Sequence, residues 1–121
     1  MSSTTAGAVP DSAASGGAFE LHRRGPGRFE ARGALTFASA RLAWEEGLVA
    51  LRADPSKTIE VECAGVTHAD SAGLAVLLDW LAAAKRGGRR ITYRYLPNSL
   101  RSLAAISDLE KLLTQGFPPS R

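Results

Sequence analysis

Residues 57–97 switch twice between two periodicities, and this switch constrains the fold more than any other feature. Apolar and polar side chains alternate in 57–65 (KTIEVECAG) and again in 89–97 (RRITYRYLP), as in half-buried strands. Between them, leucines recur at helical spacing until the pair Gly87-Gly88, which favours a helix end. Helices that join strands of one sheet indicate the α/β class. The predicted core positions of the two strands are Ile59, Val61, Cys63, Ile91, Tyr93 and Tyr95.

The segment before this unit predicts a hairpin and a helix. Residues 19–33 alternate around Gly25-Pro26-Gly27, which suits a type II turn. Residues 36–52 carry apolar side chains at spacings of three and four, and Asp54-Pro55 should end this helix. The predicted core positions are Phe19, Leu21, Phe29 and Ala31 in the strands, and Phe37, Ala40, Trp44, Leu48 and Leu51 in the helix.

Two more helices complete the pattern. One follows Pro97, with Leu100, Leu103 and Ala104 inward. The second is short and begins at a capping box, Ser107-x-x-Glu110. The order β-β-α-β-α-β-α-α predicts a four-stranded mixed sheet covered by helices.

Length and composition limit the class of protein. A chain of 121 residues with 45% hydrophobic side chains has room for one core. Residues 1–18 contain almost no large side chain, so we expect a disordered tail, followed by one domain at 19–115 and a short tail at 116–121. The longest strongly apolar run, Gly73–Leu78, is too short to span a bilayer, and no signal-peptide pattern is present. We therefore expect a cytoplasmic protein.

Catalytic readings of the sequence are weak. A triad of Ser71, His68 and Asp70 would need three groups within four consecutive residues to surround one another, and no G-x-S-x-G elbow is present. The single cysteine, Cys63, excludes an internal disulfide and has the inward phase of its strand. His22 lacks a second ligand at metal-binding spacing. We expect no enzyme, no metal and no cofactor.

A basic cluster lies where the second predicted helix meets the last strand. Tyr93 and Tyr95 interleave with it, as in a surface that stacks nucleic-acid bases. The tyrosines, however, share the core phase of Ile91, and cations are favoured at a helix C-terminus. A solvated rim is therefore preferred to nucleic-acid binding. The cluster comprises Lys85, Arg86, Arg89, Arg90 and Arg94.

Asp70 and Ser71 precede the apolar helix and have two compatible readings. Either side chain can cap the helix by accepting hydrogen bonds from free backbone N–H groups. A hydroxyl at a helix N-terminus is also a favourable place for a phosphate, because N–H donors and the positive end of the dipole meet there. Capping and regulation by phosphorylation can therefore coexist at this position.

Residues 61–93 (VECAGVTHADSAGLAVLLDWLAAAKRGGRRITY) resemble the core of STAS domains, the sulphate-transporter and anti-sigma-factor-antagonist fold. The family pattern Asp-Ser/Thr-x-Gly-Leu matches Asp70, Ser71, Gly73 and Leu74, and 33–40 (GALTFASA) is similar to the start of such domains. The resemblance spans roughly residues 19–113. It implies a STAS-like fold, although no clear fifth strand follows the third helix.

The resemblance implies two alternative functions. In anti-sigma-factor antagonists the hydroxyl that matches Ser71 is phosphorylated by a partner kinase, itself the anti-sigma factor, and the complex then breaks. In the MlaB-like branch the domain is a cytoplasmic subunit that binds the ATPase of a phospholipid-transport ABC complex. The segments DSAGLAVLL and SLRSLAAISDLEKLL are more similar to MlaB. We therefore expect an ABC ATPase as partner, with an anti-sigma kinase as the alternative.

Helix geometry predicts the docking surface. If Leu74, Leu77, Leu78 and Leu81 face the sheet, then Ala72, Val76, Asp79 and Ala83 point outward, at 100° per residue. Trp80 falls at the boundary and would face a partner, while Trp44 would belong to the core. The predicted partner-binding residues are Asp70, Ser71, Ala72, Gly73, Val76 and Trp80.

Overall fold

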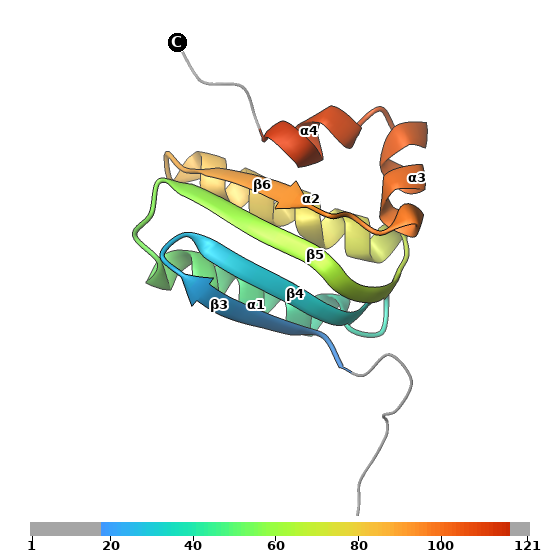
Figure 1. The fold of residues 1–121 in the computed structure, drawn as a ribbon, viewed down its shortest axis with the longest axis horizontal. Helices are drawn as coiled ribbons and strands as arrows, with labels where there is room; N and C mark the ends of the chain where they lie inside the picture. Colours follow the sequence, from blue (N-terminus) through green and yellow to red (C-terminus); the bar gives the residue numbers. More distant parts are fainter. Residues whose placement is uncertain (1–17, 117–121) are drawn as a thin grey trace, which may run out of the picture.

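The computed structural model describes residues 18–116, in which four strands form one sheet and two long helices cover one of its faces (Figure 1). In chain order the elements are β3 (Glu20–Gly25), β4 (Arg28–Leu35), α1 (Ala40–Ala53), β5 (Thr58–Ala69), α2 (Ser71–Arg86), β6 (Arg90–Arg94), α3 (Asn98–Ile106) and α4 (Glu110–Gln115). The predicted order of elements is confirmed. The predicted N-terminal tail, apart from Ala18, and residues 117–121 lie outside the described part.

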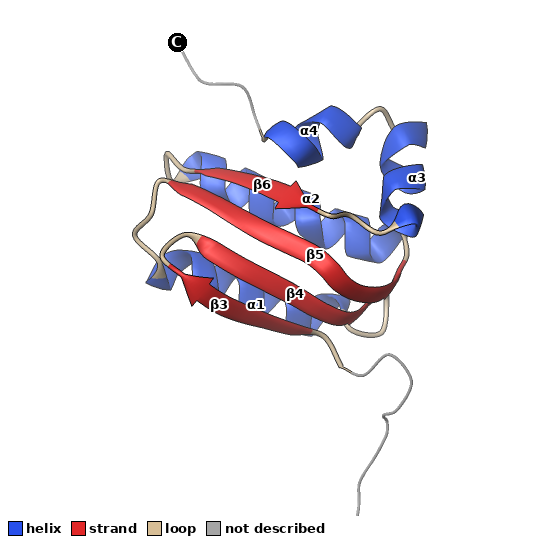
Figure 2. Ribbon diagram, in the orientation of Figure 1, coloured by secondary structure: helices blue, strands red, loops and turns tan. Residues whose placement is uncertain are grey.

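The sheet is mixed, as predicted, with strand order β3-β4-β5-β6 (Figure 2). β3 and β4 are antiparallel, whereas β4–β5 and β5–β6 are parallel. The β3–β4 turn requires glycine at position 27, because its φ is +70° and a Cβ there would lie 2.6 Å from the carbonyl oxygen of Thr58. The hairpin is therefore held against the start of β5.

The inward strand positions follow the predicted alternation, with one exception. Cys63 is fully buried, and burial raises the pKa of its thiol to about 12. Tyr93 is also buried, and its hydroxyl donates to the carbonyl oxygen of Leu77 at 2.7 Å. The prediction for Tyr95 is wrong: its side chain is 59% exposed. β6 ends at Arg94, and Tyr95 has a φ of +59°, so the strand alternation stops before it.

α1 is rotated and shorter than predicted. The helix begins at Ala40, and its buried face consists of Ala43, Gly47 and Leu51. Phe37 precedes the helix and is 84% exposed, and Trp44 is 39% exposed, so the core assignments of these two residues are wrong. The small side chains, rather than the large ones, face the neighbouring helix.

The reason lies in α2, which packs against both the sheet and α1. Trp80 is 1% exposed, and its indole Nε1 donates to the carbonyl oxygen of Trp44 at 3.3 Å. The ring lies over Gly47, where a Cβ would come within 2.0 Å of it. The prediction that Trp80 faces a partner is therefore wrong. Val76, also predicted to point outward, is 5% exposed, because two neighbours bury two flanks of this helix instead of one.

The C-terminal helices cover the β6 edge of the sheet. In α3, Leu100 and Ala104 are buried and Leu103 is partly buried, as predicted. The predicted capping box is absent: Ser107 ends α3, and α4 begins at Glu110 without a side-chain cap. No fifth strand occurs within residues 18–116, and α4 packs beside β6 instead.

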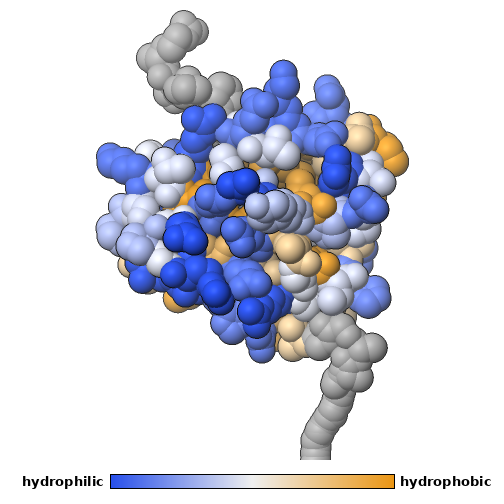
Figure 3. All heavy atoms as spheres, viewed as in Figure 1, coloured by the Kyte–Doolittle hydropathy of each residue, from blue (hydrophilic) through white to orange (hydrophobic). Residues whose placement is uncertain are grey.

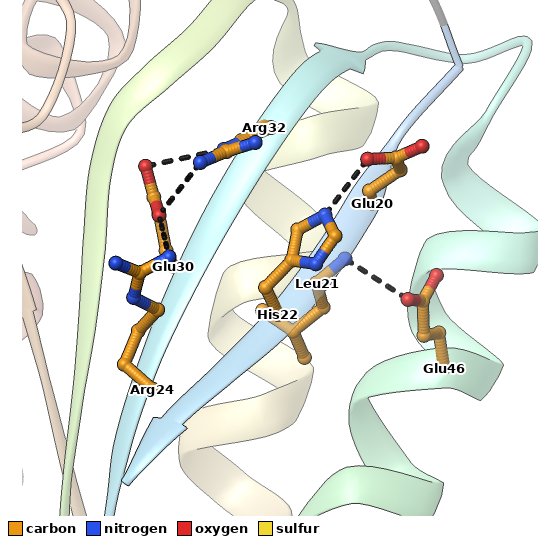
Figure 4. Close-up of polar contacts among 7 residues, drawn as sticks. All are labelled: Glu20, Leu21, His22, Arg24, Glu30, Arg32 and Glu46. Carbon is orange, nitrogen blue, oxygen red and sulfur yellow. Dashed lines mark hydrogen bonds and ion pairs between the residues drawn. The ribbon is translucent and has the colours of Figure 1, made fainter.

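Polar side chains cover the other face of the sheet and its β3 edge (Figures 3 and 4). The N–H of Leu21 donates to Glu46 of α1 at 2.9 Å, which ties the edge strand to the helix. His22 is exposed and lies 2.8 Å from Glu20. Glu30 pairs with arginines on both sides of it (Figure 4). His22 therefore lies on the surface of a strand, as predicted.

The contact between Trp80 and Gly47 generates a stability prediction. Gly47→Ala should destabilise the protein by about 1–3 kcal/mol, because the added methyl overpacks the indole. In an exposed helix position the same change would stabilise by up to about 1 kcal/mol. Gly87→Ala is the matched control, because a Cβ there meets nothing closer than 3.6 Å. Urea unfolding measures both; an unchanged or stabilised Gly47→Ala would contradict the close contact.

Candidate functional site

Asp70 is the cap of α2 and also its link to the rest of the site. Its Oδ1 accepts hydrogen bonds from the backbone N–H groups of Ala72 at 2.9 Å and Gly73 at 3.1 Å. Its Oδ2 accepts a third bond, at 3.0 Å, from the N–H of Phe37 in the β4–α1 connection. The bond from Phe37, followed by those from α2, lowers the pKa of the Asp70 carboxyl. One ionised side chain thus joins the starts of α1 and α2.

Ser71 is the first residue of α2, and its side chain is exposed. Its hydroxyl makes no hydrogen bond to any residue that the structure describes. Asp70 performs the capping that the sequence left open between the two side chains. Ser71 therefore presents a free hydroxyl at the positive end of the α2 dipole.

Gly73 lets α2 approach the sheet closely. A Cβ at this position would lie 2.1 Å from the carbonyl oxygen of Leu35, at the end of β4. Any larger residue would push the start of the helix away from the strand. The glycine of the Asp-Ser-x-Gly-Leu motif is thus explained by packing.

The hypothetical triad of Ser71, His68 and Asp70 is not formed. His68 lies on β5 rather than in a loop, is exposed, and has its Nδ1 3.3 Å from Thr67 Oγ1. The Asp70 carboxylate is occupied by backbone N–H groups. Among residues 18–116, Ser71 therefore has neither an orienting acid nor a base in hydrogen-bond contact. Within residues 18–116, no three His, Cys, Asp or Glu side chains gather closely enough to hold a metal ion.

An apolar groove of about 460 Å³ runs between the start of α1 and the first turns of α2, where Ala72, the residue after Ser71, lines it. Phe37 and Trp44 form one wall and Val76 lies in the other, with Arg41 and Asp79 as its charged groups. The complete lining is Phe37, Ala40, Arg41, Trp44, Ala72, Ala75, Val76 and Asp79. Of the predicted docking residues, Ala72 and Val76 line this groove, Asp70 and Ser71 directly precede Ala72 in the chain, and Gly73 and Trp80 are buried.

Sequence reasoning missed Phe37 and Trp44 as site residues. Both were assigned to the core because they share a helical phase with Leu48 and Leu51. The signal that could have placed them is the small-residue phase of α1, Ala43 and Gly47, which marks the side that another helix approaches. Trp44 then falls at the border of the buried face.

The basic cluster at the end of α2 does not form a stacking surface. Tyr93 is buried, and Tyr95 carries the guanidinium of Arg94 over its ring at 5.2 Å. Arg89 and Arg90 donate to backbone carbonyl oxygens of the α1–β5 connection and of Gln115. The aromatic groups and the cations therefore do not alternate on one exposed face.

The fold matches that of two solved structures of SpoIIAA. The unphosphorylated form of the anti-sigma factor antagonist SpoIIAA superposes with a TM-score of 0.58 at 16% identity, covering 74% of this chain and 83% of that one. The phosphorylated form of the Bacillus cell fate determinant SpoIIAA superposes with a TM-score of 0.60 at 18% identity, covering 76% of this chain and 85% of that one. Among proteins with curated descriptions, none matches the sequence significantly.

The amino-acid sequence assigns the chain to a family. Residues 21–114 match the family described as MlaB, STAS domain, and the chain belongs to this family. The matched range contains the Asp70–Leu74 motif and both walls of the groove. None of the described helices is long and apolar enough to cross a membrane.

The lowered pKa of Asp70 generates a pH prediction. A carboxyl with a lowered pKa stabilises the folded state above its ordinary value of 3.8, and this contribution is lost as pH falls through the lowered value. Asp70→Asn replaces one acceptor oxygen by a donor and should cost about 1–2 kcal/mol at neutral pH. The difference in the free energy of unfolding between this variant and the unmodified protein should become smaller in acid.

Urea unfolding at neutral and acidic pH measures this difference. Asp79→Asn is the control, because Asp79 is exposed on the same helix and should change stability by no more than about 0.5 kcal/mol. If Asp70→Asn lowers the free energy of unfolding by the same amount at both pH values, the charge of this carboxylate contributes nothing to stability.

Proposed function

We propose that this protein is a non-catalytic subunit that binds and regulates the ATPase of an ABC-type phospholipid-transport system. The observation that carries the proposal is the apolar groove beside the free Ser71 hydroxyl, in a chain of the MlaB, STAS domain family. The groove lies between two helices and offers two aromatic side chains, Phe37 and Trp44. Such a surface suits an amphipathic helix of a partner, with aromatic side chains as anchors.

The charges that line the groove favour an orientation. Arg41 lines it on the α1 side and Asp79 on the α2 side, and Asp70 adjoins its end. A partner helix would place an acidic side chain near Arg41 and a basic one near Asp79. Asp70 and Ser71 would then lie at the edge of the contact, where the small side chain of Ala72 allows a close approach.

A non-enzymatic role fits the local chemistry. Asp70 caps a helix, His68 contacts Thr67, and no base in the described part of the chain contacts Ser71. The proposal therefore involves no cofactor and no metal, and no nucleic acid as partner. We place the protein in the cytoplasm, at the inner membrane through the transporter complex and without insertion into the bilayer.

The alternative is an anti-sigma-factor antagonist switched by phosphorylation of Ser71. Its support is the similarity to both forms of SpoIIAA, together with the exposure of the Ser71 hydroxyl at the start of α2. Both functions use docking beside Ser71, and they differ in the partner: an ABC ATPase subunit or an anti-sigma kinase.

Affinity capture with the tagged protein separates the two. An ATPase subunit of an ABC transporter as the main captured protein supports the transport role. A histidine-kinase-like ATP-binding protein as the main captured protein supports the sigma-factor role. Capture of nucleic acid alone would contradict both.

Substitutions at Ser71 test whether it lies in the interface. Ser71→Ala should fold and bind, because a methyl group fits a close contact. Ser71→Glu should fold equally well, since the helix N-terminus favours its charge, but should lose binding. A docked partner would bury the new carboxylate beside Asp70 without a counter-charge, at a cost of several kcal/mol. Thermal melts and partner affinity measure this; undiminished binding by folded Ser71→Glu would place the interface elsewhere.

Trp44 tests the groove itself. Trp44→Ala should weaken partner binding roughly 30-fold, as expected for an aromatic hot spot. Its loss of stability should remain well below the about 3–5 kcal/mol of a buried aromatic residue, because Trp44 is 39% exposed. Leu42→Ala is the matched control, since Leu42 is 71% exposed on α1 and does not line the groove. Equal effects of both changes on affinity would argue against the groove.

A further inference from the structure

Three connections meet at the end of the sheet opposite the groove. They are the β3–β4 turn, the α1–β5 connection and the α2–β6 turn, each taken together with the adjoining ends of its elements: residues 23–28, 52–57 and 85–90. In Figure 1 all three lie at the left end of the sheet, whereas the β4–α1 and β5–α2 connections, which flank the groove, lie at the right. We call these three connections the basic end.

The basic end holds nine of the chain's fifteen Lys and Arg residues and one acidic residue, Asp54, which is 1% exposed. The C-termini of α1 and α2 also lie here, and each supplies roughly half a negative elementary charge. These two dipoles and Asp54 offset only about two of the nine cations. The nine are Arg23, Arg24, Arg28, Arg52, Lys57, Lys85, Arg86, Arg89 and Arg90.

Asp54 and Arg89 hold the three connections together. Asp54 accepts hydrogen bonds from the N–H groups of Gly27 and Ser56, both at 2.8 Å, and from Arg23 Nε at 3.0 Å. Arg89 donates to the carbonyl oxygen of Ser56 at 3.1 Å and to that of Asp54. The hydrogen bonds of the buried Asp54 carboxylate and of Arg89 therefore join the three connections, and the other cations lie around this shared base.

Each connection presents at least one cation without a partner. Arg28, Lys57 and Arg86 are exposed, and none of their side chains forms an ion pair or hydrogen bond with any residue in 18–116. Arg52 is also exposed, and its side chain likewise forms no ion pair or hydrogen bond with any residue in 18–116. Cations that stabilise the fold would be expected to contact carboxylates or carbonyl groups, as Arg23 does. These four are free to bind an external anion.

The surroundings favour a flat anionic surface over a nucleic-acid strand. Residues 23–28, 52–57 and 85–90 contain no aromatic side chain on which a base could stack. A hollow leads from the basic end, where Arg24 and Arg28 line it, along the open face of the sheet, where its lining is acidic: Glu30, Glu60 and Glu62. A polyanion following the sheet would meet these carboxylates. A plane that touches only the ends of the three connections would not.

We propose that the basic end binds the surface of a bilayer that contains anionic lipids. Guanidinium groups match the phosphate of lipid headgroups in geometry, and several adjacent cations act together on a charged surface. Because the groove and the basic end lie at opposite ends of the sheet, both can be occupied at once. The inference does not depend on which partner occupies the groove.

Co-sedimentation of the full chain with vesicles tests the proposal. The protein should bind vesicles of equal parts phosphatidylcholine and phosphatidylglycerol at low salt, and should not bind phosphatidylcholine alone. Salt at about 1 M shortens the screening length to roughly 3 Å and should release the protein. Binding to neutral vesicles, or binding that resists salt, would overturn the proposal.

A pair of charge-matched variants tests the location. The triple variant Arg28→Gln, Lys57→Gln and Arg86→Gln removes one unpaired cation from each connection. At roughly fivefold per cation, which corresponds to about 1 kcal/mol, it should lower the partition coefficient roughly 100-fold. The control variant combines Arg41→Gln, Arg101→Gln and Lys111→Gln, which lie outside the basic end. Its net charge equals that of the first variant. Because its three substitutions lie outside the basic end, its partition coefficient should change by no more than about threefold.

Circular dichroism establishes that both triple variants are folded. Equal losses of vesicle binding would show that net charge, not the basic end, is responsible, and would overturn the proposal. Binding to duplex or single-stranded DNA that the first variant loses, without vesicle binding, would also overturn it in favour of a nucleic-acid surface. Capture of the groove partner by the first variant should be unchanged, so failure here is distinguishable from failure of the proposed function.

Discussion

The contact between the Trp80 indole and Gly47 sets the arrangement on which the rest of the structure depends. The ring fills the space between α1, α2 and the sheet, and its centroid lies 6.1 Å from that of Phe19. Because position 47 has no side chain, the two helices pack side by side on the sheet, and the indole N–H reaches the carbonyl oxygen of Trp44. Trp44, whose carbonyl oxygen accepts this bond, has its own ring partly exposed, and the ring lines the groove.

Asp70 adds the second constraint, because it places Phe37. The carboxylate that caps α2 also holds the N–H of Phe37, and so fixes the connection that carries this exposed ring to the edge of α2. Gly73 brings the same helix start against the end of β4. The two aromatic side chains of the groove thus owe their positions to different interactions: Phe37 to the hydrogen bond from its N–H to the Asp70 carboxylate, and Trp44 to the packing of Trp80.

The sequence predicts the elements well and the faces of the helices poorly, for one physical reason. A strand in this sheet has one buried face, so the alternation around Val61 places its side chains correctly. α2 has two neighbours, so an analysis that assumes one buried stripe turns Val76 and Trp80 outward. Gly47, on the buried face of α1, marks the contact between the two helices. Asp70, in contrast, was predictable as a cap because capping depends on a few adjacent residues.

Asp70 caps α2, whereas the Ser71 hydroxyl takes no part in the cap. This difference explains how the surface around Ser71 could be switched without unfolding the domain. Asp70 accepts hydrogen bonds from the N–H groups of Ala72 and Gly73 at the start of α2, and its lowered pKa extends the ionised range of the carboxyl further into acid. The Ser71 hydroxyl is therefore not needed by the fold. A charge added there would be tolerated by the helix dipole, yet it would stand beside an existing carboxylate at the edge of an apolar groove. Its cost would arise only when a partner excludes water from that edge, so the added charge would act on binding and leave folding largely unchanged.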